Sequence, residues 1–402
     1  MKLVRRTDFP FRADVQLSGS KSISNRMLIA ASLCGMPFSS IHGLSDANDT
    51  QLLAHALTSK PGSDIYLADG AAPFRFFLAW AAALNFPCKI HISPELAARP
   101  SGPLLRILRA CGAQISETET GYRVLKGMEQ FPETLEGGEI SSQYASAMLL
   151  VAPVFHGTKR LQLTGSLVSK PYLDMTLRVM QQFGVNATRD GNSIVIPEGG
   201  YEAPESIRVE PDWSSAAFFY SLVACAGVET ELPGLSLNSL QGDVVCAKIY
   251  EKLGVETTAF QNGVHIRRKQ EPEKQPEFSF ENAPDLAPAV IACCAYLGLH
   301  ASFKGLQNLK YKESDRLQAI KTNLATAGIE FTEKNDVWKL RYLSDAPPVS
   351  ALTIQSFSDH RIAMAMALFA LKTEVHLDDA GCVKKSFPGF WSEWGTWFSI
   401  AE

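Results

Sequence analysis

Positively charged side chains stand in polar loops at intervals along the whole chain, rather than on the faces of long helices. Arginine suits planar, two-point recognition of phosphate and carboxylate groups, whereas lysine supplies a compact charge. These cations therefore indicate a substrate that carries more than one phosphate or carboxylate. They are Lys21 and Arg26 in GSKSISNR, Arg75 in DGAAPFR, Arg99 in AARPSG, Lys312 and Arg316 in YKESDR, Arg361 in SDHR, and Lys385 in KKSFPG.

Three acidic residues stand close to these cations in the sequence. Asp285 begins an apolar segment, Glu313 lies between two cations, and Asp359 precedes His360. Any one of them alone is more often a helix cap or an ion-pair partner. Together with the cations, they indicate general acid–base chemistry on an anionic substrate.

The segment GSKS has two other interpretations. It resembles the end of a nucleotide-binding P-loop, but that motif requires a second glycine directly before the lysine, and Ser20 stands there. It could also be a structural helix cap whose hydroxyls bond to backbone N–H groups, with Lys21 and Arg26 simply solvated.

Two patterns that recur in phase predict the elements that position these residues. In the first, a polar entry precedes a run of small apolar residues; these runs begin at Ser22, Ala72, Ser141, Ser214, Asp285 and Asp359. In the second, an amphipathic segment ends in glycine, at positions 112, 184, 254 and 328. Glycine is favoured there because it accepts the left-handed conformation just past a helix end. Six units of about 67 residues, each with a buried helix, would fill the chain.

The apolar helices are hydrophobic nearly all round, so we expect them to be interior with only their first turns exposed. Helix N-termini present unpaired N–H groups and partial positive charge. Six that converge would bind anions. The alternative is that any α/β protein has Ala-rich helices and helix-ending glycines.

Length and composition restrict the class of protein. With 402 residues, 46% of them hydrophobic, the chain is expected to form two domains. Eight cysteines without a CxxC pair are typical of a reducing compartment, and no apolar run approaches the roughly 18 residues of a membrane span. A net charge of -4 gives no bulk attraction to nucleic acid or anionic lipid. We therefore expect a cytoplasmic protein that binds no nucleic acid and no membrane.

Nine short motifs resemble, in order and over nearly the full length, the family of 5-enolpyruvylshikimate-3-phosphate synthases. They are GSKSISNR, ARPSG, SSQYASAMLL, LVSKPYLDMTL, PDWSSA, QGD, KESDRL, SDHRIAMA and KSFP. The resemblance implies an α/β enolpyruvyl transferase fold with two domains, each of three βαβαββ units. It also implies that residues 1–19 and 211–402 form one domain and 20–210 the other, with the active site in a cleft between them that closes on substrate.

The family's reaction transfers the enolpyruvyl group of phosphoenolpyruvate to the 5-hydroxyl of shikimate 3-phosphate. The resemblance implies that Lys21, Asp285 and Glu313 are catalytic, and that neither a metal nor an organic cofactor is needed. It implies shikimate 3-phosphate contacts from Lys21, Ser22, Arg26, Ser141, Ser142, Gln143, Ser169, Tyr172, Asp285, Asn308 and Lys312. It implies phosphoenolpyruvate contacts from Lys21, Asp69, Ala71, Arg99, Gln143, Arg316, Arg361 and Lys385. We expect the enzyme to be a monomer.

The segment DGAAPFR departs from the family's usual Asn-Ala-Gly-Thr-Ala-Met-Arg run. Asp69 replaces Asn, Ala71 replaces Gly, and Ala72 replaces Thr. The methyl group of Ala71 would narrow the pocket for glyphosate, an inhibitor longer than phosphoenolpyruvate. We therefore expect reduced glyphosate sensitivity.

Two rival functions differ in their sequence requirements. UDP-N-acetylglucosamine enolpyruvyl transferases share the fold, but they carry a Cys five residues before their Arg-Pro and an Asn directly after their first lysine. Pro94 and Ser22 occupy those places here. The second rival is a catalytically inactive relative that binds a sugar phosphate, for which both Asp285 and Glu313 would be unnecessary.

Overall fold

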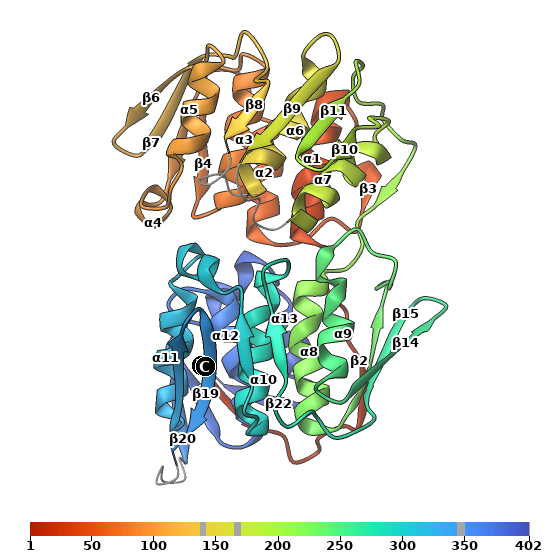
Figure 1. Ribbon diagram of the computed structural model, residues 1–402, viewed down its shortest axis with the longest axis vertical. Helices are drawn as coiled ribbons and strands as arrows, with labels where there is room; N and C mark the ends of the chain where they lie inside the picture. Colours follow the sequence, from red (N-terminus) through yellow and green to blue (C-terminus); the bar gives the residue numbers. More distant parts are fainter. Residues whose placement is uncertain (137–141, 165–169, 344–349, 402) are drawn as a thin grey trace. The chain divides into compact units, whose positions relative to one another are not determined.

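The computed structural model describes residues 1–136, 142–164, 170–343 and 350–401. The chain forms two compact units: Met1–Ser18 with Glu210–Glu402, and Gly19–Val209 (Figure 1). The first unit is thus built from two separate stretches of sequence.

In the described part of Gly19–Val209, strands form two four-stranded sheets and one strand pair. Each larger sheet joins a parallel strand pair to an antiparallel hairpin. The first runs β4 (Asp64–Ala68), β5 (Cys88–Ile92), β7 (Gly121–Lys126), β6 (Gln114–Thr118). The second runs β8 (Thr134–Glu136), β9 (Lys159–Thr164), β11 (Ser193–Ile196), β10 (Thr188–Asp190). The strand pair is β3 (Ile41–His42) with β12 (Ile207–Arg208).

The helices of this unit pack α1, α3 and α6 against one another, with α2 and α7 beside them (Figure 1). The α-helices are α1 (Lys21–Cys34), α2 (Asn48–Leu57), α3 (Ala71–Ala83), α4 (Pro94–Ala97), α5 (Gly102–Ala110), α6 (Ser142–Val151) and α7 (Lys170–Gln182). Short 3₁₀ helices are η1 (Phe38–Ser40) and η2 (Ala152–Val154).

The other unit contains three four-stranded sheets among its described residues. The first runs β2 (Arg12–Asp14), β13 (Glu229–Pro233), β15 (Gly263–Arg268), β14 (Val255–Phe260). The second runs β16 (Glu277–Ser279), β17 (Ser302–Lys304), β19 (Val337–Tyr342), β18 (Ile329–Lys334). The third runs β20 (Ala351–Ile354), β21 (Glu374–Leu377), β1 (Lys2–Arg5), β22 (Phe398–Ala401), so its last two strands come from the two ends of the chain.

In this unit α10 packs between α8 and α12. The α-helices are α8 (Trp213–Ala226), α9 (Cys246–Glu251), α10 (Ala287–Leu297), α11 (Arg316–Thr326), α12 (His360–Met366) and α13 (Phe390–Trp394). The 3₁₀ helices are η3 (Gly242–Val245), η4 (Pro284–Leu286), η5 (Gln307–Tyr311), η6 (Ala367–Leu371) and η7 (Gly381–Lys385).

The predicted repeat is confirmed: strand, helix, strand, helix and a strand pair recur, with a four-stranded sheet in five of the six described copies. The predicted helix-ending glycines are confirmed as well. Gly112, Gly184, Gly254 and Gly328 all have a positive φ, between 72° and 97°. At Gly254 a side chain would also collide with the Gln270 carbonyl oxygen, because an added Cβ would lie 2.2 Å from it.

The expectation that the first turns of the apolar helices are exposed holds only in part. Lys21, Ser22 and Ser142 are partly exposed, whereas Ser214 and Asp359 are buried. The hydroxyl of Ser20 does not cap α1; it is buried and makes no hydrogen bond among the described residues. The helices pack closely enough at their starts to cover these groups, so each buried charge needs partners of its own. In the described residues, no helix is long and apolar enough to cross a membrane.

Candidate active site

Arg316 is the centre of a buried cluster of charges in the unit that contains α10, α11 and α12. Its side chain is 1% exposed and contacts three carboxylates. Its Nε lies 2.8 Å from Asp359 Oδ2, its Nη1 lies 3.1 Å from Asp285 Oδ1, and its Nη2 lies 2.7 Å from Glu313 Oε2. Burial alone would lower the pKa of the Arg316 guanidinium. The three acids outweigh burial and raise this pKa above its ordinary value. One guanidinium therefore fixes all three acids that the sequence singled out.

Asp285 has two further cations around it. Lys312 Nζ lies 3.2 Å from its Oδ1, and Arg361 Nη2 lies 3.4 Å from its Oδ2. Burial acts to raise the pKa of the Asp285 carboxyl, but Arg361, Lys312 and Arg316 outweigh burial and hold it well below its usual range. In the absence of ligand, Asp285 is thus a carboxylate and a weak base.

Asp359 organises the start of α12. One of its oxygens accepts a hydrogen bond from the Arg361 N–H at 3.0 Å, which caps the helix, and the other accepts one from the Ser314 hydroxyl at 3.1 Å. Phe357 and Ser358, directly before it, both have a positive φ, of 54° and 53°. Such a conformation is strained in residues other than glycine and costs of the order of 1–3 kcal/mol per residue. The strain is tolerated where it turns Asp359 back toward Arg316.

Asp243 is a buried acid to which the sequence analysis assigned no role, although it lies in QGD, one of the nine motifs. It lies in η3 and accepts a hydrogen bond from the Ser214 hydroxyl at the start of α8. Burial, together with the negative charge of Asp285, raises its pKa to about 7. The sequence signal for Asp243 was only the motif itself, because burial is not visible in the sequence.

Replacing Asp243 should change how stability depends on pH. Because the pKa is about 7 in the folded protein and 3.8 ordinarily, the folded state binds this proton more tightly than the unfolded state. The resulting stabilisation is complete below pH 4 and is lost as the pH rises through 7. Asp243→Asn should therefore unfold at a similar urea concentration to the parent near pH 4. At pH 8, above the pKa of the folded state, it should be more stable by roughly 4 kcal/mol. Equal differences at both pH values would contradict this prediction.

In the unit Gly19–Val209, Lys21 pairs with an acid that the sequence analysis missed. The Lys21 Nζ lies 2.9 Å from Asp49 Oδ2, and Asp49 is 3% exposed. Asp49 lies in the first turn of α2. An acid in a first helical turn is so common that its position in the sequence did not distinguish it from an ordinary helix-start residue.

Arg26 is buried without an acidic partner among the described residues. Its Nε donates to Thr176 Oγ1 at 2.8 Å, its Nη1 donates to the Ser22 carbonyl at 2.7 Å, and its Nη2 donates to Ser146 Oγ at 3.1 Å. Burial lowers its pKa to about 10, and the ring of Tyr172 lies 5.8 Å from the guanidinium carbon. A buried cation held only by neutral groups attracts an anion.

Arg75 forms a second buried cationic position. It donates to the Gln143 side-chain oxygen, and its guanidinium carbon lies 5.0 Å from the centre of the Tyr144 ring. A further guanidinium nitrogen donates to the Pro100 carbonyl at 3.3 Å, next to Arg99. Arg99 itself has a buried Nε without a hydrogen-bond partner in the described chain.

The other predicted site residues are described by their element and burial. Lys385 is buried at the end of η7, which packs on α12. Asn308 lies in η5, Tyr172 in α7, and Ser22 and Ser142 at the starts of α1 and α6, all partly exposed. Ala71 is buried at the start of α3, two residues after Asp69. Ser141 and Ser169 lie outside the described residues.

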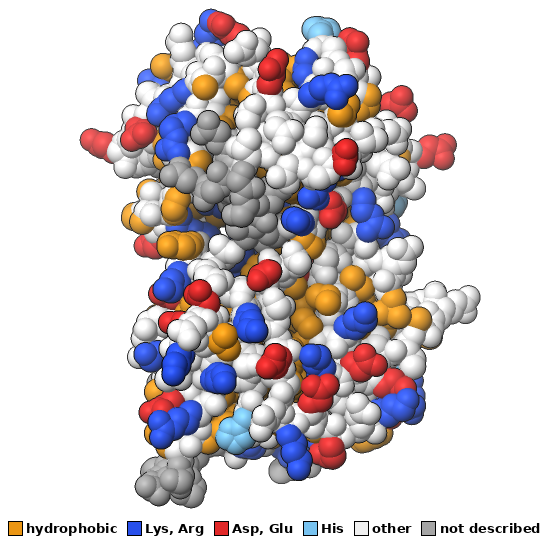
Figure 2. Space-filling model, viewed as in Figure 1, with side chains coloured by type: hydrophobic (Ala, Val, Ile, Leu, Met, Phe, Trp, Pro, Cys, Tyr) orange, Lys and Arg blue, Asp and Glu red, His pale blue; other side chains and the backbone are white. Residues whose placement is uncertain are grey.

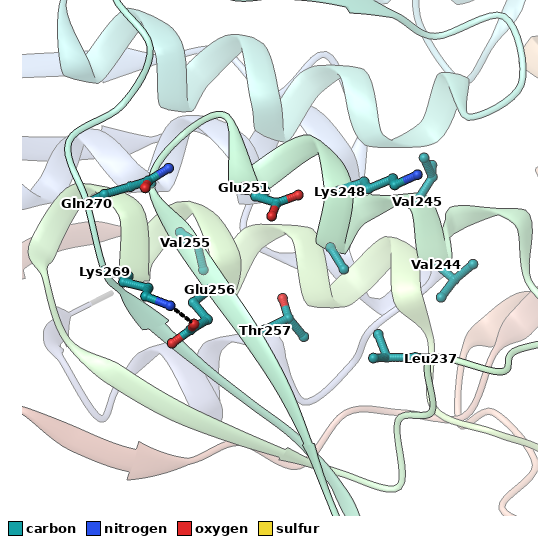
Figure 3. Close-up of a pocket in the computed structure, with 12 residues that line it drawn as sticks. Leu237, Val244, Val245, Lys248, Glu251, Val255, Glu256, Thr257, Lys269 and Gln270 are labelled. Carbon is teal, nitrogen blue, oxygen red and sulfur yellow. Dashed lines mark hydrogen bonds and ion pairs between the residues drawn. The ribbon is translucent and has the colours of Figure 1, made fainter.

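A pocket of about 570 Å³ is lined by none of these residues. It lies between α9 and the start of β14, and its lining includes Leu237, Val244, Lys248 and Glu251 (Figure 3). Glu256 at its edge is already paired with Lys269. Figure 2 shows hydrophobic side chains gathered on the surface beside the β14–β15 hairpin. Within the described ranges, no group of three or more His, Cys, Asp or Glu is placed to hold a metal ion.

The chain matches known proteins over nearly its whole length. A family model described as EPSP synthase (3-phosphoshikimate 1-carboxyvinyltransferase) matches residues 6–60 and 70–394. Asp69, the departure noted in the sequence, falls in the unmatched interval. A 3-phosphoshikimate 1-carboxyvinyltransferase from Bacteroides fragilis strain YCH46 is 36% identical over 396 residues, covering 95% of this chain and 94% of its own. One from Vibrio campbellii is 32% identical over 416 residues, covering 95% of this chain and 96% of its own.

Solved structures agree in fold. An EPSP synthase structure from Acinetobacter baumannii has a TM-score of 0.78 at 21% identity, covering 100% of this chain and 99% of its own. The enolpyruvyl transferase NikO from Streptomyces tendae has a TM-score of 0.73 at 16% identity, covering 100% of this chain and 99% of its own. At these identities the likeness establishes the fold alone.

Proposed function

The chain belongs to the EPSP synthase family, the 3-phosphoshikimate 1-carboxyvinyltransferases, and from that premise we propose how its own side chains perform the reaction. The enzyme transfers the enolpyruvyl group of phosphoenolpyruvate to the 5-hydroxyl of shikimate 3-phosphate. Proton addition at the methylene carbon leaves cationic character at C2, and the hydroxyl attacks there. Phosphate then leaves the tetrahedral ketal intermediate as the methylene proton is removed again.

The observation that carries the proposal is the cluster around Arg316. Two acids, Asp285 and Glu313, are fixed by the same guanidinium, and Lys312 and Arg361 lie beside Asp285. A catalyst of proton addition and proton removal needs two acids in different electrostatic surroundings. Here Asp285 contacts Lys312, Arg316 and Arg361, and Glu313 pairs with Arg316 at 2.7 Å.

Glu313 gives the methylene proton to phosphoenolpyruvate and takes it back, and Asp285 accepts the hydroxyl proton. The low pKa of Asp285 suits this role only after ligand binds, because a ligand phosphate or carboxylate competes for Lys312 and Arg361. As those cations turn to the ligand, Asp285 becomes a stronger base. Binding thus activates the base at the moment it is required.

Shikimate 3-phosphate is bound by cations and hydroxyls. Arg26 supports this assignment, since it is a buried cation with neutral partners. We keep the full predicted set: Lys21, Ser22, Arg26, Ser141, Ser142, Gln143, Ser169, Tyr172, Asp285, Asn308 and Lys312.

Phosphoenolpyruvate is bound by Lys21, Asp69, Ala71, Arg99, Gln143, Arg316, Arg361 and Lys385. We add Arg75 to this set, because the Gln143 side-chain oxygen already accepts a hydrogen bond from it. Gln143 therefore orients a cation at this position.

A turnover assay tests the function against its rivals. Phosphate release from phosphoenolpyruvate should require shikimate 3-phosphate and should not occur with UDP-N-acetylglucosamine in its place. Absence of release with both substrates would indicate an inactive relative. Release that depends on UDP-N-acetylglucosamine would assign the chain to the rival enzyme.

Glyphosate sensitivity should depend on Ala71. This side chain is 5% exposed at the start of α3, so its methyl group occupies space that glycine would leave open. Ala71→Gly should lower the glyphosate concentration for half-inhibition by about 10-fold or more, the effect of one methyl group in a close-fitting pocket. The measurement is inhibition at fixed phosphoenolpyruvate relative to KM. Unchanged inhibition would count against this role.

We also propose that the enzyme works in the cytoplasm as a monomer. All eight cysteines are free, which agrees with a reducing compartment. One chain supplies every residue to which a role is given. Sedimentation at micromolar concentration should show a single species of 44.0 kDa.

A further inference from the structure

Asp49 is a buried acid that contacts the proposed catalytic lysine. Its Oδ2 lies 2.9 Å from Lys21 Nζ, and the two residues are 28 positions apart in the sequence. The Asp49 side chain is 4% exposed and that of Lys21 is 16% exposed, so the pair is largely shielded from water. A pair in such surroundings is screened much less than one on the surface.

Lys21 stands at an unfavourable place for a cation. It is the first residue of α1, and the N-terminus of a helix carries partial positive charge. No acidic residue lies in the first turn of α1 to offset it. Asp49 supplies the missing negative charge from α2, in whose first turn an acidic side chain is itself favoured.

The second oxygen of Asp49 is fixed by packing. Oδ1 is buried and makes no hydrogen bond among the described residues. It lies against Gly70, the residue just before α3, because a Cβ added there would be 3.3 Å from Oδ1 and 3.1 Å from the Leu67 carbonyl oxygen. Gly70 thus leaves the space that this carboxylate occupies, and the carboxylate has a defined position.

We propose that Asp49 is the positioning residue of Lys21: it holds the ammonium in one place, where the ammonium meets the anionic substrate. The inference rests on the role of Lys21 in the proposed function and extends it to a residue that has none there. Asp49 touches no substrate. Its effect on turnover passes through Lys21.

A double-mutant cycle tests this dependence. Asp49→Asn should lower kcat/KM for phosphoenolpyruvate by about 100-fold, the effect of misplacing a catalytic group by about 1 Å. In a Lys21→Met background, Asp49→Asn should cause no further loss, because the group it positions is absent. A further loss of 10-fold or more in that background would show that Asp49 acts by another route and would overturn the inference.

A matched control separates this effect from simple loss of a charge. Asp174 pairs with Arg189 at 2.7 Å in the same unit, with its side chain 54% exposed. Asp174→Asn removes an equivalent aspartate–cation pair and should leave kcat/KM within 2-fold of the parent. Far-UV circular dichroism and thermal unfolding show whether each variant is folded.

A second measurement does not depend on turnover. Labelling of Lys21 by an amine-reactive reagent at pH 8, followed by mass spectrometry, should be about 10-fold faster in Asp49→Asn than in the parent or Asp174→Asn. The reason is that the 2.9 Å ion pair with Asp49 holds the amine in place, and without this pair the side chain reaches the reagent more freely. Equal labelling rates would overturn the inference.

The results that would contradict the proposed role of Lys21 differ from those that would contradict the inference about Asp49. If Lys21→Met keeps full turnover, the proposed role of Lys21 is wrong and the inference falls with it. If Lys21→Met is inactive while Asp49→Asn keeps full turnover, the proposed function stands and only the inference is overturned.

Discussion

Glu313→Gln is expected to lower kcat by about 10²- to 10⁴-fold, the usual contribution of a general acid–base group. The Glu313 Oε2 accepts a hydrogen bond from Arg316 Nη2 at 2.7 Å. Glutamine keeps an oxygen that can accept this bond but cannot give up a proton to the methylene carbon. The loss should therefore appear in kcat, with KM for both substrates changed less. The measurement is steady-state turnover with each substrate saturating in turn.

The control for this variant is another Glu–Arg pair in the same unit. Glu330 lies 3.6 Å from Arg341, and both side chains are exposed. Glu330→Gln should leave kcat unchanged. Full turnover in Glu313→Gln would show that Glu313 does not carry the proton.

Arg316→Met is expected to have the largest effect on stability. Its side chain is 1% exposed and contacts Asp285, Glu313 and Asp359, so its removal leaves three carboxylates with fewer cations in a buried place. Breaking a buried pair by removing one partner typically costs about 3–5 kcal/mol. We expect a loss of this size in the free energy of unfolding in urea near pH 7, together with loss of turnover.

The loss should be smaller at low pH. Three cations hold the pKa of Asp285 well below its usual range, and once Asp285 is protonated Arg316 has one negative charge fewer to balance. As a control, Arg341→Met removes a 76% exposed arginine and should change stability by less than about 1 kcal/mol. An Arg316→Met enzyme as stable as the parent would mean that the cluster is not held together by this guanidinium.

The repeat could be predicted from the sequence because local sequence features determine it. A helix that is apolar all round predicts burial from its composition, and a glycine at a helix end predicts a left-handed turn from its missing side chain. Gly112 and Gly328, more than 200 positions apart, follow the same local rule and adopt the same turn. The motifs also determined the family, since nine of them occur in order.

Predictions of helix capping and of exposed helix starts failed where tertiary packing determines the contacts of a side chain. The Ser20 hydroxyl has the right type and position to cap α1, yet it makes no such bond. The first turns of the helices look exposed in the sequence because they are polar, yet Asp359 is completely buried. Polarity in a sequence indicates a need for partners, and those partners can be protein groups as readily as water.

The sequence by itself determined the repeat, the family and the kinds of side chain that the chemistry requires. Only the tertiary structure decided which charges meet. Arg316 meets Asp359, 43 positions away, Lys21 meets Asp49 across 28 positions, and Arg26 meets Thr176 across 150. Asp243 and Asp285 are the same residue type, yet burial raises the pKa of one to about 7 while three cations hold the other well below its usual range. The reason is physical: contact distances and desolvation depend on how distant segments pack, and neither is a property of a short stretch of sequence.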